Sequence, residues 1–385
     1  MNVIYINFLG SYSKGDYYLP GSDSFFNFGI GQFISSEFIN RGYPLTAENW
    51  RVDARIDHVM EKSIDGILCR IFPPFRFFKV FDSFSIKMAL MLREKSKNPE
   101  VIFHFMGTHL LNYYLYAILL GKKRSIATHL GDPNPLWRYK RSKKLKHLIF
   151  YFAEKYFFLK YYKYIVTICK AEVTYYEKIG IPVKHMPVYG VCREHIFVIK
   201  DRQLCRKKLG LPLDKKIILQ VGRAVEYRGF DWILPLIDHY EDKDDYLFVF
   251  LGINKWDPYY EELVKRKCIV KGYMEHLDLV DYYNAADVFI FFIVGEKVLT
   301  FGGTGYVPFE SLACGTPVVA TSLHHIKYTR VTEVTRIPNY NYDVIPMIEE
   351  LISLNINREL CREIALNIFS WDSILREYWG IYSNK

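Results

Sequence analysis

Short, uninterrupted apolar segments, each ended by turn residues, constrain the fold of this chain most strongly. They do not alternate apolar and polar residues, which is typical of parallel strands that are covered on both faces. The segments are Val3–Phe8, Val101–Phe105, Ile217–Val221, Tyr246–Leu251, Val288–Phe292 and Val318–Ala320. Helical patterns such as Phe25–Asn40 and Trp232–Tyr240 lie between them. This alternation predicts βαβ units and an α/β fold with doubly wound sheets.

The chain has 385 residues, which is enough for two domains with ordinary cores. The polar stretch Phe197–Asp214 ends in a Gly-Leu-Pro turn before a new apolar segment, and this composition marks a domain boundary. We therefore predict a first domain over residues 1–198 and a second over residues 199–368. The last segment, residues 369–385, begins with Ser370 as a helix N-cap and predicts a closing helix.

Composition limits the partners and the compartment of the protein. Lys and Arg total 51 against 42 Asp and Glu, and the net charge of +9 favours anionic partners. No recognisable nucleic-acid module accompanies this charge, so nucleic acid is not a predicted partner. The seven cysteines contain no C-x-x-C pair, which favours a reducing compartment without a disulfide framework or a zinc site. No signal peptide or membrane span is recognisable, so we expect a cytoplasmic protein.

The stretch Thr304–Thr321 is the most informative part of the chain for function. Glu310 opens a short helical run, and the turn Gly315-Thr316-Pro317 then leads into an apolar strand. A carboxylate at a helix start behind a glycine-rich loop is how an α/β sheet presents a ligand pocket at its strand ends. The stretch resembles the donor-site signature of retaining glycosyltransferases of family 4. That resemblance implies the GT-B architecture, in which two Rossmann-like doubly wound domains face a central cleft and a C-terminal helix crosses back to the N-terminal domain.

The resemblance covers most of Lys215–Tyr382 and implies a site for the diphosphate of a nucleotide sugar. After Gly222, Arg223 and Arg228 fall on the family's two diphosphate-neutralising positions. Two cations are needed there because negative charge builds on the leaving group, and an Arg grips phosphate oxygens with two donors. The alternative is a pair of solvated loop arginines. Gly272 and Tyr273 match the backbone turn that faces the nucleobase, although ordinary packing of a βα turn explains them almost as well.

The family pattern pairs two glutamates, and only the second is present in this chain. Glu310 matches the ribose-binding glutamate, whereas Gly302 stands where the sugar-binding glutamate is expected. We hypothesise an insertion that displaces the loop, so that Glu296 or the backbone amides of Gly302–Gly305 hold the sugar. In the alternative interpretation, Glu296 is an ordinary surface residue. The predicted donor-contacting residues of this segment are Glu296, Gly302, Gly303, Thr304, Gly305, Tyr306, Val307 and Glu310.

The first half of the chain resembles the family more loosely. Gly29 and Gly31 match its opening glycine turn, which lets the backbone approach a phosphate or the reacting sugar, although a plain turn is the alternative. His129, in SIATHLGDP, corresponds best to the family's catalytic-site histidine, which contacts the 6-hydroxyl of the sugar. For His104 and His109 we expect ordinary core or loop residues.

The segment Trp137–Tyr164 combines a basic beginning with apolar residues at helical spacing. The basic residues are Arg138, Lys140, Arg141, Lys143, Lys144 and Lys146, and the apolar stripe is Leu145, Leu148, Ile149, Phe152, Tyr156 and Leu159. This pattern favours an interfacial helix on an anionic membrane surface. A core helix with a solvated basic entry is the alternative, because any globular helix needs an amphipathic stripe.

The resemblance thus predicts a hexosyltransferase that moves sugar from a nucleotide-diphosphate donor to a glycan or lipid-linked acceptor with retention of configuration. The base is open between UDP, GDP and ADP, and no metal or other cofactor is expected. The string Asp242-Lys243-Asp244 mimics a D-x-D metal motif, but it is typical of a solvated acidic turn. We expect a cytoplasmic enzyme that is peripheral on the inner face of the membrane. The alternative is a non-catalytic GT-B protein that binds nucleotide or membrane and supports a partner enzyme.

Overall fold

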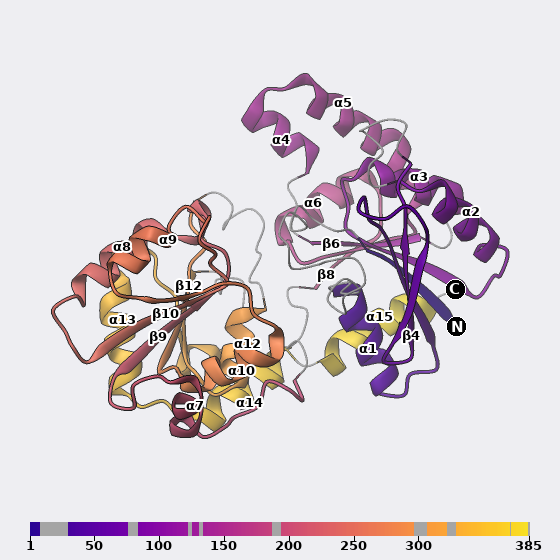
Figure 1. The fold of residues 1–385 in the computed structure, drawn as a ribbon. Coiled ribbons are helices and arrows are strands. Elements are labelled where there is room, and N and C mark those ends of the chain that lie inside the picture. Colours follow the sequence, from indigo (N-terminus) through magenta and orange to yellow (C-terminus); the bar gives the residue numbers. More distant parts are fainter. Residues whose placement is uncertain are drawn as a thin grey trace. The chain divides into compact units, whose positions relative to one another are not determined.

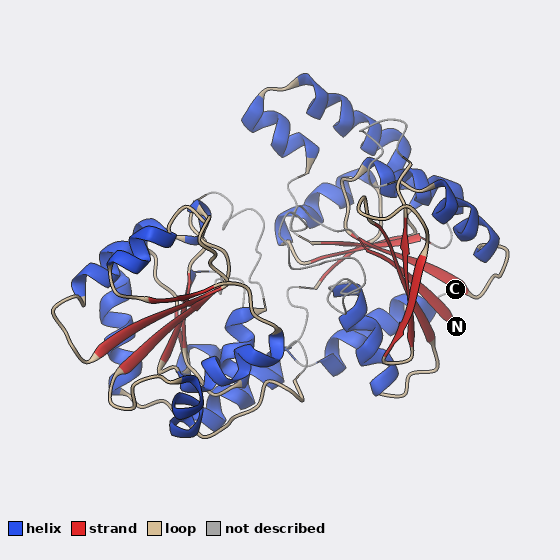
Figure 2. Ribbon diagram, viewed as in Figure 1, coloured by secondary structure: helices blue, strands red, loops and turns tan. Residues whose placement is uncertain are grey.

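The computed structural model describes residues 1–7, 30–75, 84–121, 125–130, 134–186, 194–295, 306–321, 329–369 and 371–383. The chain divides into two compact units, one formed by Met1–Met186 with Leu375–Lys385 and the other by Pro187–Ile374. Each unit is built on a twisted sheet with helices packed against it (Figure 1, Figure 2). The predicted α/β class with doubly wound sheets is therefore present in both halves of the chain.

The sheet of the first unit has the strand order β3-β4-β2-β1-β5-β6-β7-β8. Its strands are β1 (Asn2–Asn7), β2 (Thr46–Val52), β3 (Met60–Ile64), β4 (Ile67–Phe72), β5 (Val101–Met106), β6 (Ser125–His129), β7 (Tyr164–Thr167) and β8 (Val183–His185). Neighbouring strands are parallel except for the antiparallel pair β3 and β4. The order reverses between β1 and β5, and the carboxyl ends of strands beside such a switch point are where α/β sheets bind ligands.

The helices of the first unit include a change of helix type before β7. They are α1 (Ile30–Asn40), α2 (Ile86–Lys95), α3 (Leu111–Leu120), α4 (Pro135–Ser142), α5 (Leu145–Ala153) and α6 (Lys170–Ile179). After α5 the chain forms a π-helical turn, Glu154–Phe158, and a 3-10 turn, Leu159–Tyr161. The predicted continuous helical pattern over Trp137–Tyr164 is thus broken, because Lys143 adopts a left-handed backbone with φ of 55° between α4 and α5.

The sheet of the second unit is entirely parallel, in the order β11-β10-β9-β12-β13-β14. Its strands are β9 (Lys216–Val221), β10 (Tyr246–Leu251), β11 (Ile269–Lys271), β12 (Val288–Phe291), β13 (Val318–Ala320) and β14 (Thr335–Arg336). Its helices are α7 (Arg202–Leu209), α8 (Phe230–His239), α9 (Tyr260–Lys265), α10 (His276–Ala285), α12 (Val307–Ala313), α13 (Val344–Ser353) and α14 (Arg358–Phe369). The switch point of this sheet lies between β9 and β12.

Two apolar cores cover the two faces of this second sheet. Leu219 of β9 packs into a core with α10, α12 and α14, whereas its neighbour Ile218 packs into a core with α8 and α13. Because successive side chains point to opposite faces, a strand covered on both faces needs apolar residues at every position. This explains the uninterrupted apolar segments of the sequence.

The chain joins the second unit earlier than the boundary at residue 198 that composition suggests. Phe197 is fully buried in the core of this unit. The backbone N–H of Lys200 donates to Asn284 Oδ1 at 2.7 Å, and Asn284 Nδ2 donates to the carbonyl of Val198 at 3.0 Å. Polar composition marks this stretch as a boundary, but its backbone is held by the side chain of Asn284 in α10 and by Arg358 and Arg362 of α14.

The predicted closing helix is α15 (Trp371–Ser383), and its residues from Leu375 onward belong to the first unit. The hydroxyl of Tyr378 lies 3.0 Å from Thr128 Oγ1, and the hydroxyl of Tyr382 lies 2.6 Å from His104 Nδ1. Burial lowers the pKa of His104 to about 3, so this imidazole is neutral. The prediction that His104 is a core residue is confirmed. The predicted N-cap, Ser370, lies outside the described residues.

Candidate functional site

Three adjacent strands of the second sheet are each followed directly by a glycine. The N–H of Gly222, after β9, donates to Leu251 O at 2.9 Å, and the N–H of Gly252, after β10, donates to Lys271 O at 2.9 Å and to Gly272 O at 3.1 Å. Gly252 has a φ of +83°, and a Cβ there would lie 3.5 Å from the backbone of Gly222. The carboxyl edge of the sheet therefore exposes backbone that side chains do not cover, as close approach of a ligand requires.

The two predicted diphosphate-binding arginines follow β9 and lie at the switch point of the sheet. The guanidinium carbon of Arg228 lies 4.4 Å from the ring centroid of Phe291, the last residue of β12. This distance permits a cation–π contact, which fixes the guanidinium over the end of β12. Arg223 is exposed, and its Nη2 donates to the hydroxyl of Tyr227 at 3.1 Å. The turn thus places two cations at the edge where the sheet binds ligands.

Glu310 lies in the first turn of α12 and is only 1% exposed. Its Oε2 accepts a hydrogen bond from the hydroxyl of Tyr283 at 2.9 Å, whereas Oε1 has no hydrogen-bond partner among the described residues. Burial raises the pKa of Glu310 to about 7, although the hydrogen bond from Tyr283 lowers it. A buried oxygen without a partner is costly in free energy, so hydroxyl donors from a ligand would stabilise it.

Several predicted site residues lie outside the described residues, namely Gly29, Glu296, Gly302, Gly303, Thr304 and Gly305. The hypothesis that Glu296 replaces the missing glutamate therefore stays a prediction. Tyr306 and Val307 are described: Tyr306 is the N-cap residue of α12, and Val307 is its first residue. Gly31 lies in α1, where a Cβ would overlap the side-chain oxygen of Asn7 at the end of β1. A side chain at position 31 would therefore require the side chain of Asn7 to move, so packing of α1 on β1 is one reason for glycine there.

His129 is the last residue of β6 and is fully buried. Its Nδ1 lies 3.0 Å from Oγ1 of Thr167, the last residue of β7. The structure therefore places the predicted catalytic-site histidine at the carboxyl edge of the first sheet. Its ring lies 5.3 Å from that of His109, in an edge-to-face arrangement.

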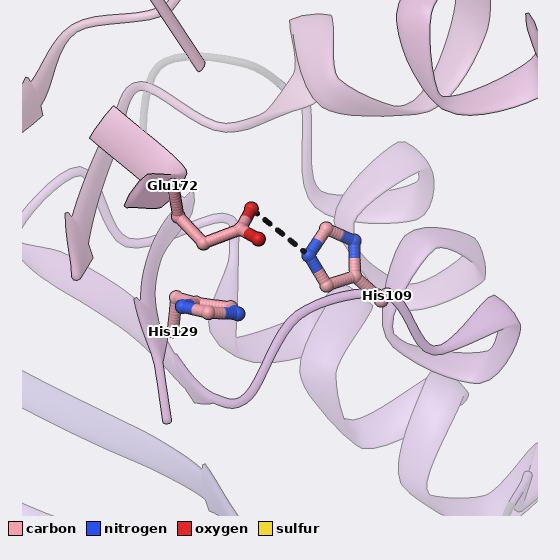
Figure 3. Close-up of side chains that lie close together, drawn as sticks. All are labelled: His109, His129 and Glu172. Atoms are coloured by element: carbon pink, nitrogen blue, oxygen red, sulfur yellow. Dashed lines mark ion pairs between the residues drawn. The ribbon is translucent and has the colours of Figure 1, made fainter. Parts of the chain in front are cut away.

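His109 is part of a charged cluster that the sequence did not predict (Figure 3). It follows β5 with a left-handed φ of 59°, and its Nδ1 lies 2.8 Å from Glu154 Oε1. Its Nε2 lies 3.8 Å from Oε2 of Glu172, in the first turn of α6. Burial by itself would lower the pKa of His109, but the two carboxylates outweigh it and raise the pKa to about 9. His109 is buried, as expected of a core residue, yet its environment is ionic.

The sequence carries only part of the signal for this cluster. His109 and His129 both follow strands of a parallel sheet, whose carboxyl ends meet at one edge. Glu154 belongs to the π-helical turn and Glu172 to a helix, and no spacing in the sequence links either to a histidine. One donor atom each from His109, His129 and Glu172 lies within 4.8 Å of the other two.

Residues 201–368 match the family model described as glycosyl transferases group 1. This part of the chain is a glycosyl transferases group 1 domain. It contains β9 to β14 and also Arg223, Arg228 and Glu310. The predicted family resemblance is confirmed for this domain.

Curated relatives agree with this assignment. The chain is 27% identical over 194 residues to an uncharacterized glycosyltransferase of Methanocaldococcus jannaschii, with 46% of this chain and 47% of that protein covered. It is 28% identical over 196 residues to the D-inositol 3-phosphate glycosyltransferase of Xylanimonas cellulosilytica, covering 47% and 45% of the two chains. The chain thus spans about half the length of the curated relatives it matches.

Solved structures extend the likeness in fold to the whole chain. The Anabaena protein HepE, in complex with UDP-glucose, superposes with a TM-score of 0.67 at 13% identity and covers 100% of both chains. The glycosyl transferases group 1 domain is accordingly the second half of a GT-B fold, as the sequence predicts. Within the described residues, no helix combines the length and apolarity needed to cross a membrane.

Proposed function

We propose that the chain is a retaining glycosyltransferase that moves a hexosyl unit from a nucleotide-diphosphate sugar to a glycan or lipid-linked acceptor. The observation that carries the proposal is the buried Glu310, whose Oε1 has no hydrogen-bond partner among the described residues. The two hydroxyls of a ribose are donors of the kind that this carboxylate needs. The named relatives are glycosyltransferases, and HepE holds UDP-glucose, so UDP-sugars are the first donors to test.

The proposed chemistry uses Arg223 and Arg228 as the electrostatic partners of the leaving diphosphate. The bond between the anomeric carbon and the diphosphate oxygen breaks, and a bond to the acceptor oxygen forms on the same face of the sugar. The acceptor's proton passes to the departing diphosphate oxygen. Preorganised cations stabilise charge as it develops on the leaving group, and the two guanidinium groups supply two such charges. We therefore propose that transfer needs no metal ion at the diphosphate.

The remaining assignments complete a model of donor recognition. The backbone around Gly272 and the exposed Tyr273 is proposed to hold the nucleobase, at the end of β11. Gly29 and Gly31 are proposed to let the backbone approach the phosphate or the reacting sugar. Glu296 or the backbone of residues 302–305 is proposed to hold the transferred sugar, and His129 to orient it.

Release of nucleoside diphosphate from UDP-, GDP- and ADP-sugars tests this proposal directly. We expect the wild-type chain to release diphosphate from one of these donors, which also raises its melting temperature because a ligand stabilises the folded state it binds. His129→Ala should keep the thermal stabilisation and lose turnover. Arg228→Gln should bind nucleoside diphosphate about 10–100-fold more weakly, since it loses charge-assisted hydrogen bonds, whereas Arg228→Lys keeps the charge as a matched control.

The outcomes separate catalysis from mere binding. Stabilisation by a nucleotide sugar without release of diphosphate, in the presence and absence of candidate acceptors, would favour the non-catalytic GT-B scaffold. The sequence feature behind that alternative is Gly302, which stands in place of the sugar-binding glutamate. Absence of both stabilisation and release with all three donors would overturn the proposal. Wild-type turnover in His129→Ala would remove this residue from the mechanism.

We also propose that α5 and the turn after it contact an anionic membrane surface at the inner face of the cytoplasmic membrane. None of the residues of α5 is buried, and Leu145, Ile149 and Phe157 are 64%, 61% and 61% exposed. Leu159, at the end of the predicted stripe, is fully buried, but a core helix would also bury Leu145 and Ile149, so their exposure supports the interfacial interpretation. The pair α4 and α5 stands away from the sheet of the first unit (Figure 1).

The charge around this apolar stripe is positive and matches anionic headgroups. Lys143, Lys144 and Lys146 are exposed and form no ion pair with described residues. Desolvation and the neighbouring cations Lys146, Arg138 and Lys144 lower the pKa of His147. Each Lys or Arg near an anionic surface contributes about 1 kcal/mol of attraction. A lipid-linked acceptor would be reached at such a surface.

Vesicle co-sedimentation tests the membrane contact. We expect binding to vesicles that contain phosphatidylglycerol, little binding to pure phosphatidylcholine, and loss of binding at high salt. The double variant Ile149→Gln/Phe157→Gln should bind more weakly. Leu277→Gln, which changes a 60% exposed residue of α10, is the matched control and should bind as the wild type does. Binding that ignores both the lipid charge and the double substitution would contradict the proposal.

A further inference from the structure

Three successive strand ends of the first sheet bring nitrogen and oxygen donors to one buried point. His109 follows β5, His129 ends β6, and Glu172 lies in the helix that follows β7. The side chains of His109 and Glu172 are 0% and 1% exposed, and His129 is fully buried. Figure 3 shows the three side chains converging from different segments of the fold.

Each histidine of this cluster is oriented through its Nδ1 by a second residue. His109 Nδ1 lies 2.8 Å from Glu154 Oε1, which also accepts from the hydroxyl of Tyr114 at 2.7 Å. His129 Nδ1 lies 3.0 Å from Thr167 Oγ1. Donation from Nδ1 to an oxygen fixes the tautomer that has its lone pair on Nε2, and this is how metal-binding histidines are held in proteins.

Glu172 is held in the same manner and presents one oxygen to the cluster. Its Oε1 accepts from Asn134 Nδ2 at 2.7 Å, whereas its buried Oε2 has no hydrogen-bond partner among the described residues. A buried carboxylate oxygen without a donor is costly in free energy. It therefore indicates a ligand at this point.

The distance between His109 and Glu172 favours a bridging ion over a direct hydrogen bond. The same imidazole of His109 meets Glu154 at 2.8 Å but Glu172 at 3.8 Å, which is too long for a hydrogen bond. Two ligands of one tetrahedral ion lie about 3.4 Å apart when each metal–ligand distance is about 2.1 Å. The hydroxyl of Tyr176 lies 3.2 Å from His109 Nε2. It also lies 3.1 Å from Thr108 Oγ1 and can donate its proton there, which leaves the lone pair of Nε2 for a metal ion.

The charge of the cluster also matches a divalent ion. Glu154 and Glu172 are both fully buried, and neither forms an ion pair with a described Lys or Arg. A divalent ion at this point would carry the charge opposite to that of the two carboxylates. Buried charges need such compensation.

We propose that His109, His129 and Glu172 bind one divalent transition-metal ion, for which Zn²⁺ is the best match. Two imidazoles and a carboxylate are a zinc donor set that leaves a fourth position for water or a polar group. The ion would fix the ring of His129 at the sheet edge. The inference stands independently of the proposed sugar transfer, because metal binding can be measured without donor or acceptor.

Metal content of the full-length chain tests the proposal. After exposure to Zn²⁺ and gel filtration, we expect about one Zn²⁺ per chain by mass spectrometry of the metal. Exchange with Co²⁺ should give the visible absorption bands of a four-coordinate site. A wild-type chain that retains less than about a tenth of an ion and gives no such bands would overturn the proposal.

Substitutions locate the ion. Glu172→Gln should lose it, and Glu154→Gln should weaken Co²⁺ binding about 10–100-fold, because residues that orient ligands tune affinity to this extent. His104→Gln, a buried histidine of β5 outside the cluster, is the matched control and should keep full metal content. If the folded Glu172→Gln variant kept the full metal content per chain, the ion would lie elsewhere and the proposal would be wrong. If Glu172→Gln fails to fold, the wild-type metal content and Co²⁺ spectrum decide the matter.

Discussion

At the scale of single residues, Glu310 shows how a binding site can oppose stability. Among the described residues its carboxyl accepts one hydrogen bond, from Tyr283, and burial raises its pKa from 4.5 to about 7. The folded state therefore holds a proton between these pH values that the unfolded state has released. This contribution to stability is fully present below about pH 4.5 and is lost as the pH rises through 7. A shift of this size corresponds to about 3 kcal/mol.

Glu310→Gln should remove this loss, because an amide keeps the contact with Tyr283 and does not ionise. We expect the free energy of unfolding of the variant to exceed that of the wild type by up to about 3 kcal/mol at pH 8, and by much less at pH 5. Urea denaturation at the two pH values measures the difference. The same variant should bind nucleotide more weakly, because the ribose hydroxyls would lose the carboxylate that accepts their hydrogen bonds. Parallel pH profiles for variant and wild type would show that Glu310 is not the titrating group.

At the scale of elements, the sequence was sufficient wherever a strand is buried on both faces. The strand Tyr246–Leu251 has the predicted bounds, and β12 ends one residue before the predicted Phe292. The positions of Arg223 and His129 at strand ends, and of Glu310 in the helix between β12 and β13, follow from the same βα alternation. The Glu154–His109 pair could not be predicted, because it depends on how a π-helical turn packs beside the end of β5. The break between α4 and α5 could not be predicted either, because it lies at Lys143 and not at a Gly or Pro.

The turn between β9 and α8 depends on a glycine that the structure explains. Gly229 has a φ of +69°, and a Cβ there would lie 2.7 Å from Cβ of Phe292. Gly229→Ala should therefore combine backbone strain with overlap, and we expect a loss of more than about 1 kcal/mol in stability, measured by urea denaturation. It should also weaken nucleotide binding, since the turn carries Arg228.

Gly210 provides a matched control for this substitution. It has a φ of +66° in the same unit, and a Cβ there would meet no atom within 4 Å. Gly210→Ala should cause the backbone strain alone, so the difference between the two variants measures the overlap with Phe292. Equal losses for both variants would show that the contact with Phe292 contributes nothing.

At the scale of the whole molecule, the chain returns to its first unit only through the second part of α15. Residues from Leu375 onward contribute Tyr378 and Tyr382, whose hydroxyls contact Thr128 and His104 on neighbouring strands. These hydroxyls satisfy polar atoms inside a core built from β1, β5 and β6. Stability of the first unit is thus tied to the end of a chain that passes through the whole second unit before it returns.

Deletion of residues 375–385 should destabilise the first unit selectively. His104 Nδ1, which lies 2.6 Å from the hydroxyl of Tyr382, would lose this buried partner, and the aromatic contacts of Trp379 with Phe38 and Tyr43 would disappear. A single lost partner of this kind costs about 1–3 kcal/mol, so Tyr382→Phe should show the same effect in reduced form. Hydrogen exchange followed by peptide mass spectrometry measures each unit separately.

We expect faster exchange in β1, β5 and β6 of both variants, and unchanged exchange in β9, β10 and β12. Tyr340→Phe, at a residue of the second unit that is 58% exposed, is the matched control and should leave both units unaffected. A uniform increase across the chain would mean that the two units unfold together. No increase in the first unit would mean that the contacts of α15 add nothing to its stability. Only an effect confined to the first unit agrees with a closing helix that is energetically part of it.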